Sequence, residues 1–193
     1  MTKAEFVAHN RDRLLLDRAI VIEEPITSAV ADRVVGRMLD LEAKSGADIF
    51  LFLDSPGGDL KAALAVYEAM RFTACTVVTI GMGQAASSAA LLLAAGSAGL
   101  RVALSDARIT LHRPHAAPGT RGENEDAQMQ RLNTLVFKIF SAHIARPLEV
   151  VELAAREDRT FTAAEAQAFG IVDAVDLIPA KACSPRAASG GCR

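Results

Sequence analysis

A pair of serines, Ser87 and Ser88, follows a glycine-containing segment in the middle of the chain. That segment, residues 81–84, is typical of a turn between a strand and a helix, so Ser87 is expected at or near a helix N-terminus. Unpartnered backbone N–H groups and the positive end of the helix dipole favour a developing negative charge there. Ser87 is therefore a candidate nucleophile with an oxyanion site beside it, whereas a serine that only caps the helix is the commoner arrangement.

A serine nucleophile needs a base, and the chain has 4 histidines. His112 ends a predicted strand over residues 108–112, and open α/β sheets place their active sites at such strand ends. His115, just beyond a proline, is a weaker candidate. His9 lies in an unstructured start of the chain, and His143 lies on the apolar stripe of a predicted helix, where a packed side chain is expected. The pattern favours His112 as the base.

A carboxylate that holds the histidine in the right tautomer would complete a Ser-His-Asp triad. Asp158 lies in a link without helical or strand periodicity, and Asp106 lies in the turn before the His112 strand. Both are suitable by position, and spacing and composition do not choose between them.

Two consecutive glycines, Gly57 and Gly58, follow a predicted buried strand and a proline. Glycines allow the backbone to approach a ligand closely, so the N–H groups of Gly58 and Ser88 are candidate oxyanion donors. Taken alone, the turn is explained equally well by glycines that merely end a strand.

Hydrophobic periodicity predicts a scaffold that positions these residues. The predicted strands cover residues 19–24, 49–53, 76–80, 101–104, 108–112 and 171–175. The first predicted helix begins after Thr27 or Ser28. Further helices are predicted over residues 59–71, 85–98, 123–145 and 148–155. A short helix follows, which Thr162 and Glu165 open and Gly170 closes. The repeated strand–helix–strand order predicts an α/β domain with a largely parallel sheet.

The helix over residues 123–145 follows the predicted α/β core. Its apolar stripe is expected at Met129, Leu132, Val136, Ile139 and His143. A long helix in this place serves packing between subunits or a lid, and an ordinary surface helix is equally compatible with its composition.

A run of 29 residues, from Phe72 to Leu100, carries no charge and is long enough to span a bilayer. Its first part is β-branched, its second part is rich in alanine and leucine, and glycines and polar residues interrupt the two. A strand, a turn and a helix buried in a core are therefore favoured, and no membrane span is predicted.

The composition excludes further classes of function. The 193 residues carry 21 Lys and Arg against 23 Asp and Glu, so no nucleic-acid partner is predicted. The charged N-terminus lacks the apolar run of a signal peptide, so we expect a cytoplasmic protein. The cysteines show no CxxC spacing, so we expect no metal site. The length fits a single domain over residues 11–178, after a short N-terminal segment (1–10) and before a disordered tail (179–193).

Four segments resemble signatures of a known family. They are D-S-P-G-G-D at 54–59, G-M-G-Q-A-A-S-S at 81–88, I-T-L-H-R-P at 109–114 and E-D-R-T-F-T-A-A-E-A at 157–166. Their order and spacing are similar to those of the proteolytic subunit of the Clp protease, from about residue 13 to residue 175. The resemblance implies a serine endopeptidase on a crotonase-like α/β fold, a spiral of βαβ units with a projecting handle helix at about 123–145.

The resemblance also assigns roles to single residues. It implies Ser87 as the nucleophile, His112 as the base and Asp158 as the orienting carboxylate. It implies backbone oxyanion donors at Gly58 and Ser88, and it implies no cofactor or metal.

Partners follow from the same resemblance. Family members stack two heptameric rings into a tetradecamer that encloses the active sites, here built from this chain alone or mixed with a paralogue. An AAA+ ATPase unfoldase feeds unfolded polypeptides into the chamber. Phe50, Phe52 and Phe72 match aromatic positions of the pocket where that unfoldase docks.

Two stretches depart from the family pattern. The N-terminal segment 1–10 is short and matches poorly, and residues 113–117 lack the usual Gly-Gly pair. Because of these departures, a subunit that joins the ring without catalysing hydrolysis is kept as an alternative to the endopeptidase. A crotonase-type acyl-CoA enzyme would share the fold and the paired-amide oxyanion site, but alanines stand near the second turn, where such enzymes use a carboxylate.

Overall fold

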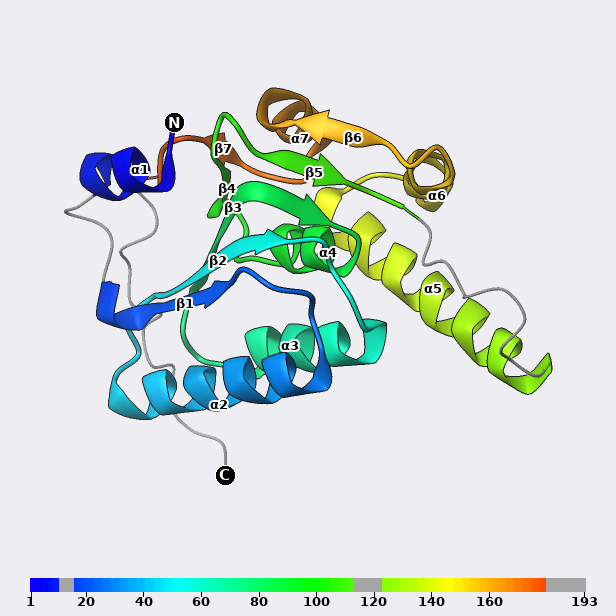
Figure 1. Cartoon of the computed structure of the whole chain (residues 1–193), viewed down its shortest axis with the longest axis horizontal. Coiled ribbons are helices and arrows are strands. Elements are labelled where there is room, and N and C mark those ends of the chain that lie inside the picture. The colour runs from blue at the N-terminus through cyan, green and yellow to red at the C-terminus, as the bar shows by residue number, and fades with distance from the viewer. Residues whose placement is uncertain (11–15, 113–122, 180–193) are drawn as a thin grey trace.

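A computed structural model describes residues 1–10, 16–112 and 123–179 (Figure 1). Its strands are β1 (Ala19–Ile22), β2 (Ile49–Ser55), β3 (Val77–Ala86), β4 (Arg101–Ala103), β5 (Arg108–Thr110), β6 (Thr160–Thr162) and β7 (Ala174–Val175). They form one seven-stranded sheet in which β1, β2, β3, β4 and β7 are neighbours in that order and run parallel. β5 pairs parallel with the second half of β3, and β6 pairs antiparallel with β5.

Helices connect consecutive strands except β4 and β5. They are α1 (Lys3–His9), the 3-10 helix η1 (Leu16–Arg18), α2 (Ser28–Lys44), α3 (Leu60–Phe72), α4 (Ser88–Ala94), α5 (Glu123–Ile144), α6 (Leu148–Arg156) and α7 (Ala163–Phe169). Figure 1 shows α2 and α3 side by side along one face of the sheet, α1 on the other side, and α5 extending away from the body. The predicted α/β class with a largely parallel sheet is confirmed.

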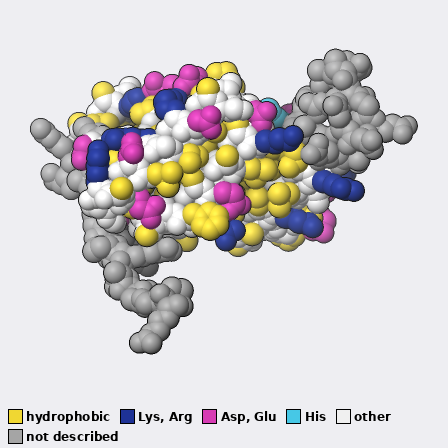
Figure 2. Space-filling model, turned by 90° about the horizontal axis from the view of Figure 1, so that it is seen from below, with side chains coloured by type: hydrophobic (Ala, Val, Ile, Leu, Met, Phe, Trp, Pro, Cys, Tyr) yellow, Lys and Arg dark blue, Asp and Glu magenta, His cyan; other side chains and the backbone are white. Residues whose placement is uncertain are grey.

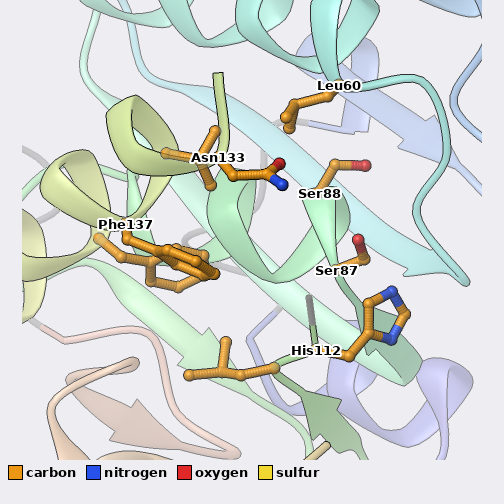
Figure 3. Close-up of a pocket in the computed structure, with 9 residues that line it drawn as sticks. Leu60, Ser87, Ser88, His112, Asn133 and Phe137 are labelled. Atoms are coloured by element: carbon orange, nitrogen blue, oxygen red, sulfur yellow. The ribbon is translucent and has the colours of Figure 1, made fainter. Parts of the chain in front are cut away.

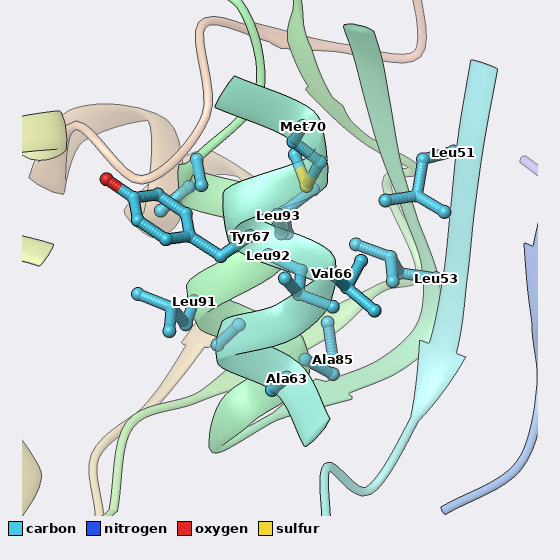
Figure 4. Packing of buried hydrophobic residues seen from close by; sticks show 14 of the residues in the cluster. Leu51, Leu53, Ala63, Val66, Tyr67, Met70, Ala85, Leu91, Leu92 and Leu93 are labelled. Atoms are coloured by element: carbon cyan, nitrogen blue, oxygen red, sulfur yellow. The ribbon is translucent and has the colours of Figure 1, made fainter. Parts of the chain in front are cut away.

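Strand β2 explains why residues 49–53 are uniformly apolar, because both of its faces are buried. Leu51 and Leu53 face Val66 and Met70 of α3 (Figure 4). The alternate residues of the strand point to a second cluster on the opposite face, together with Phe6 of α1. A strand covered on both faces needs no polar alternation, as in other α/β sheets.

The predicted turn at residues 81–84 is wrong, because β3 continues through it to Ala86. Leu53 pairs with Gly81 but Ser55 pairs with Ala85, so β3 carries extra residues opposite β2. Gly83 adopts a φ of 48°, and the side chain of Asp54 accepts the N–H of Gln84 at 2.8 Å. The glycines therefore mark a bulge rather than a turn, and the bulge lets the first half of β3 pair with β4 and the second half with β5.

Several other predicted bounds need correction. The helix expected over residues 85–98 is shorter, since α4 spans Ser88–Ala94, and the last strand is reduced to β7. β6 lies at the end of a link that showed no periodicity, because three residues pair with β5 without an alternating pattern of their own. All seven residues of α4 are buried, which explains the uncharged stretch by packing rather than by a membrane. Within the described residues, no helix combines the length and apolar character needed to cross a bilayer.

The N-terminal segment is not unstructured where the structure describes it. Thr2 and Glu5 form a capping box, which starts α1. Phe6 is fully buried and its ring meets that of Phe52 edge-on, at 6.5 Å between centroids. The helix therefore covers the face of the sheet opposite α2 and α3.

Figure 2 views the molecule from the side of α2 and α3, where hydrophobic side chains on the outer surface lie among acidic and basic ones. Leu39 of α2 and Phe72 of α3 are large apolar side chains exposed to solvent. The tail predicted over 179–193 lies outside the described residues from 180 onward, as do His115 and residues 113–117.

Candidate active site

Ser87 stands between β3 and α4 in a backbone conformation that side chains seldom adopt. Its φ is 55° and its ψ is −121°. Although it occupies the N-cap position, its side chain makes no capping hydrogen bond to α4. Its N–H donates to the carbonyl of Thr110 at 2.9 Å, which ties the junction to β5. Helix capping therefore does not explain this serine, and backbone strain of this kind is concentrated at functional sites.

His112 lies beside Ser87 because the strands that carry them are neighbours. Ala86 pairs with Thr110 in the parallel register of β3 and β5. Ser87 directly follows the end of one strand and His112 comes just beyond the end of the other. Both residues line the same pocket, and Figure 3 shows the hydroxyl of Ser87 next to the imidazole of His112. The placement agrees with the rule that open α/β sheets bind ligands beyond the carboxyl ends of their strands.

Asp158 comes shortly before β6, the strand that pairs antiparallel with β5. Thr110 pairs with Thr160, and the N–H of Leu111 donates to the carbonyl of Arg159 at 3.0 Å. His112 comes two residues after β5 and Asp158 two residues before β6, so both lie beyond the same end of this strand pair.

The end of α6 fixes the backbone of Asp158. The N–H of Arg159 donates to the carbonyl of Ala154 at 3.0 Å, the long-range bond of a Schellman motif. Asp158 takes the left-handed position of that motif with a φ of 47°, a place usually held by glycine. An aspartate at this position is a second strained residue at the site.

Asp106, the other candidate carboxylate, lies before the opposite end of β5. Its Oδ2 atom accepts a hydrogen bond from the N-terminal amine of Met1 at 3.1 Å. The length of β5 therefore separates it from His112, and it serves to attach the N-terminus.

The glycine turn after β2 packs directly against the serine junction. A Cβ atom on Gly57, whose φ is 87°, would lie 2.6 Å from the carbonyl oxygen of Ala86 and 2.8 Å from the Cβ of Ser87. Both distances are too short for real contacts, so only glycine lets the two turns approach this closely. The simple explanation that these glycines only end a strand is therefore insufficient.

The N–H groups of Gly58 and Ser88 lie where the glycine turn meets the serine junction. Ile26 donates to the carbonyl of Gly57 at 2.9 Å and accepts from Asp59 at 2.7 Å, so this bridge does not use the N–H of Gly58. Ser88 is the first residue of α4, where N–H groups have no partner within the helix. Ser88 and Gly58 thus sit on two turns in contact near Ser87.

Replacing Gly57 with alanine is expected to lower the free energy of unfolding by about 1–3 kcal/mol, because the new Cβ clashes with the backbone at Ala86. Displacement of the serine junction is expected to slow any Ser87-dependent reaction by about 100-fold. Urea unfolding and initial rates measure the two effects. Gly36→Ala is the matched control, since a Cβ there meets nothing within 4 Å in the interior of α2, and its stability should be equal or higher.

The buried side of α5 shares Val136 with the predicted stripe but is otherwise rotated from it. Phe137, Phe140 and Ile144 are buried as well, whereas Leu132 and Ile139 are only partly buried. The spacing of these buried residues is as helical as that of the predicted stripe, so periodicity did not distinguish the two faces. As a result, sequence reasoning missed the pocket residues that α5 contributes.

His143 is packed, as predicted. Its Nε2 atom lies 3.3 Å from the hydroxyl of Tyr67, and the two rings meet edge-on. Burial, followed by the charges of Arg101 and Arg71, lowers the pKa of His143. It lines a different hollow from Ser87 and is no candidate base for it.

The three phenylalanines matched to a docking pocket do not share one surface in this chain. Phe50 and Phe52 are buried in the cluster beneath α1. Phe72 ends α3, which packs on the opposite face of β2, and its side chain is 84% exposed. In the described part of the chain, no group of three or more His, Cys, Asp or Glu could hold a metal ion.

Comparison with protein families gives an independent result. The family model described as Clp protease matches residues 2–177. The match includes the glycine turn, the serine junction, His112 and the Asp158 link in a single alignment. Because it covers nearly the whole chain, the resemblance of the four motifs is confirmed and the protein belongs to the Clp protease family.

Proposed function

We propose that the protein is a serine endopeptidase, the proteolytic subunit of an ATP-dependent Clp-type protease that hydrolyses unfolded polypeptides inside an oligomeric chamber. The observation that carries the proposal is Ser87, a strained serine whose hydroxyl does not cap its helix and which shares a pocket with His112. Membership in the Clp protease family supports a peptidase of this type.

In the proposed reaction, His112 removes the proton from the Ser87 hydroxyl as the oxygen attacks the peptide carbonyl. The tetrahedral intermediate places its negative oxygen between the N–H groups of Gly58 and Ser88, which the contact of the two turns supports. His112 then gives the proton to the leaving amine, and the peptide bond breaks. A water molecule, deprotonated by His112, releases the acyl group and restores Ser87.

Asp158 acts as the orienting carboxylate in this proposal. Its place beyond the same end of the β5–β6 pair as His112 supports the role, because a carboxylate that reached the imidazole would accept its N–H and stabilise the imidazolium that forms. The attachment of Asp106 to the N-terminal amine supports the choice of Asp158 over it.

The proposal extends to fold and assembly. We assign the chain to the crotonase-like spiral of βαβ units, with α5 as the handle helix between two stacked heptameric rings of this chain, alone or mixed with a paralogue. The extension of α5 away from the body supports the handle (Figure 1). An AAA+ unfoldase would contact exposed Phe72 directly, and would reach Phe50 and Phe52 only if α1 left the sheet.

Labelling with a fluorophosphonate probe, followed by peptide mapping, tests the central claim. We expect a covalent adduct on Ser87, lost in His112→Ala because the nucleophile is then no longer activated. A correctly assembled particle that hydrolyses no peptide and never labels at Ser87 would instead be a non-catalytic ring partner. Turnover of an acyl-CoA, with none of peptides, would favour a crotonase-type enzyme.

A further inference from the structure

A second hollow opens at the opposite end of α4 from Ser87, where the ends of α3 and α5 meet the loop after α4. Its volume is about 280 Å³, whereas the space that one water molecule needs is about 10–15 Å³. Its lining includes Arg71, Thr73, Ser97, Arg101 and His143, and none of the described residues that line it is an aspartate or a glutamate. The hollow therefore has room for a small ligand, and these polar side chains determine which kind.

Two hydroxyl groups in the hollow are available as hydrogen-bond donors. Thr73 Oγ1 accepts the N–H of Cys75 at 3.2 Å, and Ser97 Oγ accepts the N–H of Val77 at 3.0 Å. In the hydrogen bonds found among the described residues, both hydroxyls act only as acceptors, so each keeps a proton to donate. Thr73 is only 5% exposed, and a buried donor of this kind requires an acceptor in the hollow.

Arg71 gives the hollow an unbalanced positive charge. Its guanidinium lies 5.9 Å from the centre of the Tyr67 ring, and it forms no ion pair within the part of the chain that the structure describes. Arg101 is different, because Asp173 binds one edge of its guanidinium, with 2.8 Å from Nε to Oδ2 and 2.5 Å from Nη2 to Oδ1. Asp173 balances the charge of Arg101, and the charge of Arg71 remains.

His143 reports the sign of the electrostatic potential at this place. Its pKa is lowered by burial first and then by the positive charges of Arg101 and Arg71. A group whose protonation is disfavoured by neighbouring cations lies in a positive potential. The hollow therefore combines a positive potential with several hydrogen-bond donors, which is the complement of an anion.

The arrangement of the donors indicates the shape of the anion. The donors come from separate segments, namely the end of α3, the loop after it and the loop after α4. A carboxylate presents its acceptor sites in one plane, whereas a phosphate group presents oxygens in all directions. A guanidinium also matches phosphate geometry with two parallel N–H groups. A phosphate group therefore fits this set of donors better than a carboxylate.

We propose that this hollow is a binding site for a phosphate group, held by the guanidinium of Arg71 and the hydroxyls of Thr73 and Ser97. The site goes beyond the proposed peptidase function, since none of these three residues lines the pocket of Ser87. The phosphate group can belong to the free ion or to a larger molecule such as a nucleoside monophosphate.

Isothermal titration calorimetry of the assembled protein with inorganic phosphate and with adenosine monophosphate, at constant ionic strength, tests the proposal. We expect saturable binding of one phosphate group per chain. Arg71→Gln should weaken the binding by about 10-fold or more, because it removes a charged hydrogen-bond partner. Arg33→Gln is the matched control, since Arg33 is an exposed arginine of α2 outside the hollow, and the affinity should be unchanged.

Ser97→Ala is a second variant, because it removes a hydroxyl and keeps both arginines, and we expect binding about 10-fold weaker. Urea unfolding of each variant shows whether it is folded. Tighter binding of adenosine monophosphate than of inorganic phosphate supports a site for a larger molecule, and equal binding supports a site for the free ion.

Two results would overturn the site. One is the lack of saturable binding of either probe, and the other is an affinity that Arg71→Gln and Ser97→Ala leave unchanged. Neither result bears on Ser87, and a failure of Ser87 to label with the fluorophosphonate probe leaves the phosphate site intact.

Discussion

Replacing Ser87 with alanine is expected to lower kcat for a peptide substrate by about 10⁴- to 10⁶-fold. The variant keeps the N–H groups of Gly58 and Ser88 and the substrate pocket, so part of the binding remains. It loses the oxygen that forms the acyl-enzyme, and the other hydroxyl among the described residues that line the pocket, that of Ser88, is buried. Initial rates of fluorogenic peptide hydrolysis, with native mass to establish the assembly, provide the measurement.

Ser28→Ala is the matched control for this experiment. Ser28 is exposed at the start of α2, and Thr27 rather than Ser28 caps that helix, so rate and stability should be unchanged. If Ser87→Ala kept more than about 1% of the wild-type rate, a serine mechanism at Ser87 would be excluded.

Asp158→Asn is expected to lower kcat by about 10⁴-fold, because in the proposed triad an amide at position 158 would hold the His112 imidazole in the wrong tautomer and would not stabilise the imidazolium. Stability should hardly change. Asparagine tolerates the left-handed conformation that the Schellman motif imposes on position 158, where φ is 47°. Steady-state kinetics and urea unfolding on the same preparation separate the loss of activity from any loss of structure.

Two further variants sharpen this prediction. Asp158→Gly should be equally inactive but as stable as the wild type or more so, since glycine is the usual residue at this position of a helix end. Asp106→Asn changes only the attachment of the N-terminal amine and should keep the rate within about two-fold. An inactive Asp106→Asn together with an active Asp158→Asn would reverse the assignment of the carboxylate.

Helix caps and one buried strand, which depend on residues close together in the sequence, were predicted correctly. Thr27 caps α2, and Thr162 and Glu165 form the predicted capping box that Gly170 ends. Each of these signals consists of a side chain that bonds backbone within the same turn, so neighbours in the sequence are sufficient to form it. The apolar run at residues 49–53 indicated a strand buried on both faces for a similar reason, since no polar alternation was present.

The sequence did not predict β6 and α1, two short elements that depend on contacts with other parts of the fold. β6 has three residues and forms because β5 supplies the hydrogen bonds. α1 carries a capping box that could have indicated it, but its seven residues are too few for a helix that is stable by itself, and Phe6 stabilises it on the sheet. The bulge in β3 was predicted as a turn because glycines mark both features, and only the register against β2 distinguishes them.

The order and type of the main elements, the motifs that resemble the Clp protease family, and the candidate pair Ser87 and His112 could all be predicted from the sequence. Those features depend on residue types and on spacings within single elements. Long-range packing attached Asp106 to the N-terminal amine, away from His112, and brought Asn133 to the pocket beside Ser87. Neither contact follows from local sequence, because the register of β5 against its neighbours and the rotation of α5 about its axis are set by residues far apart in the chain.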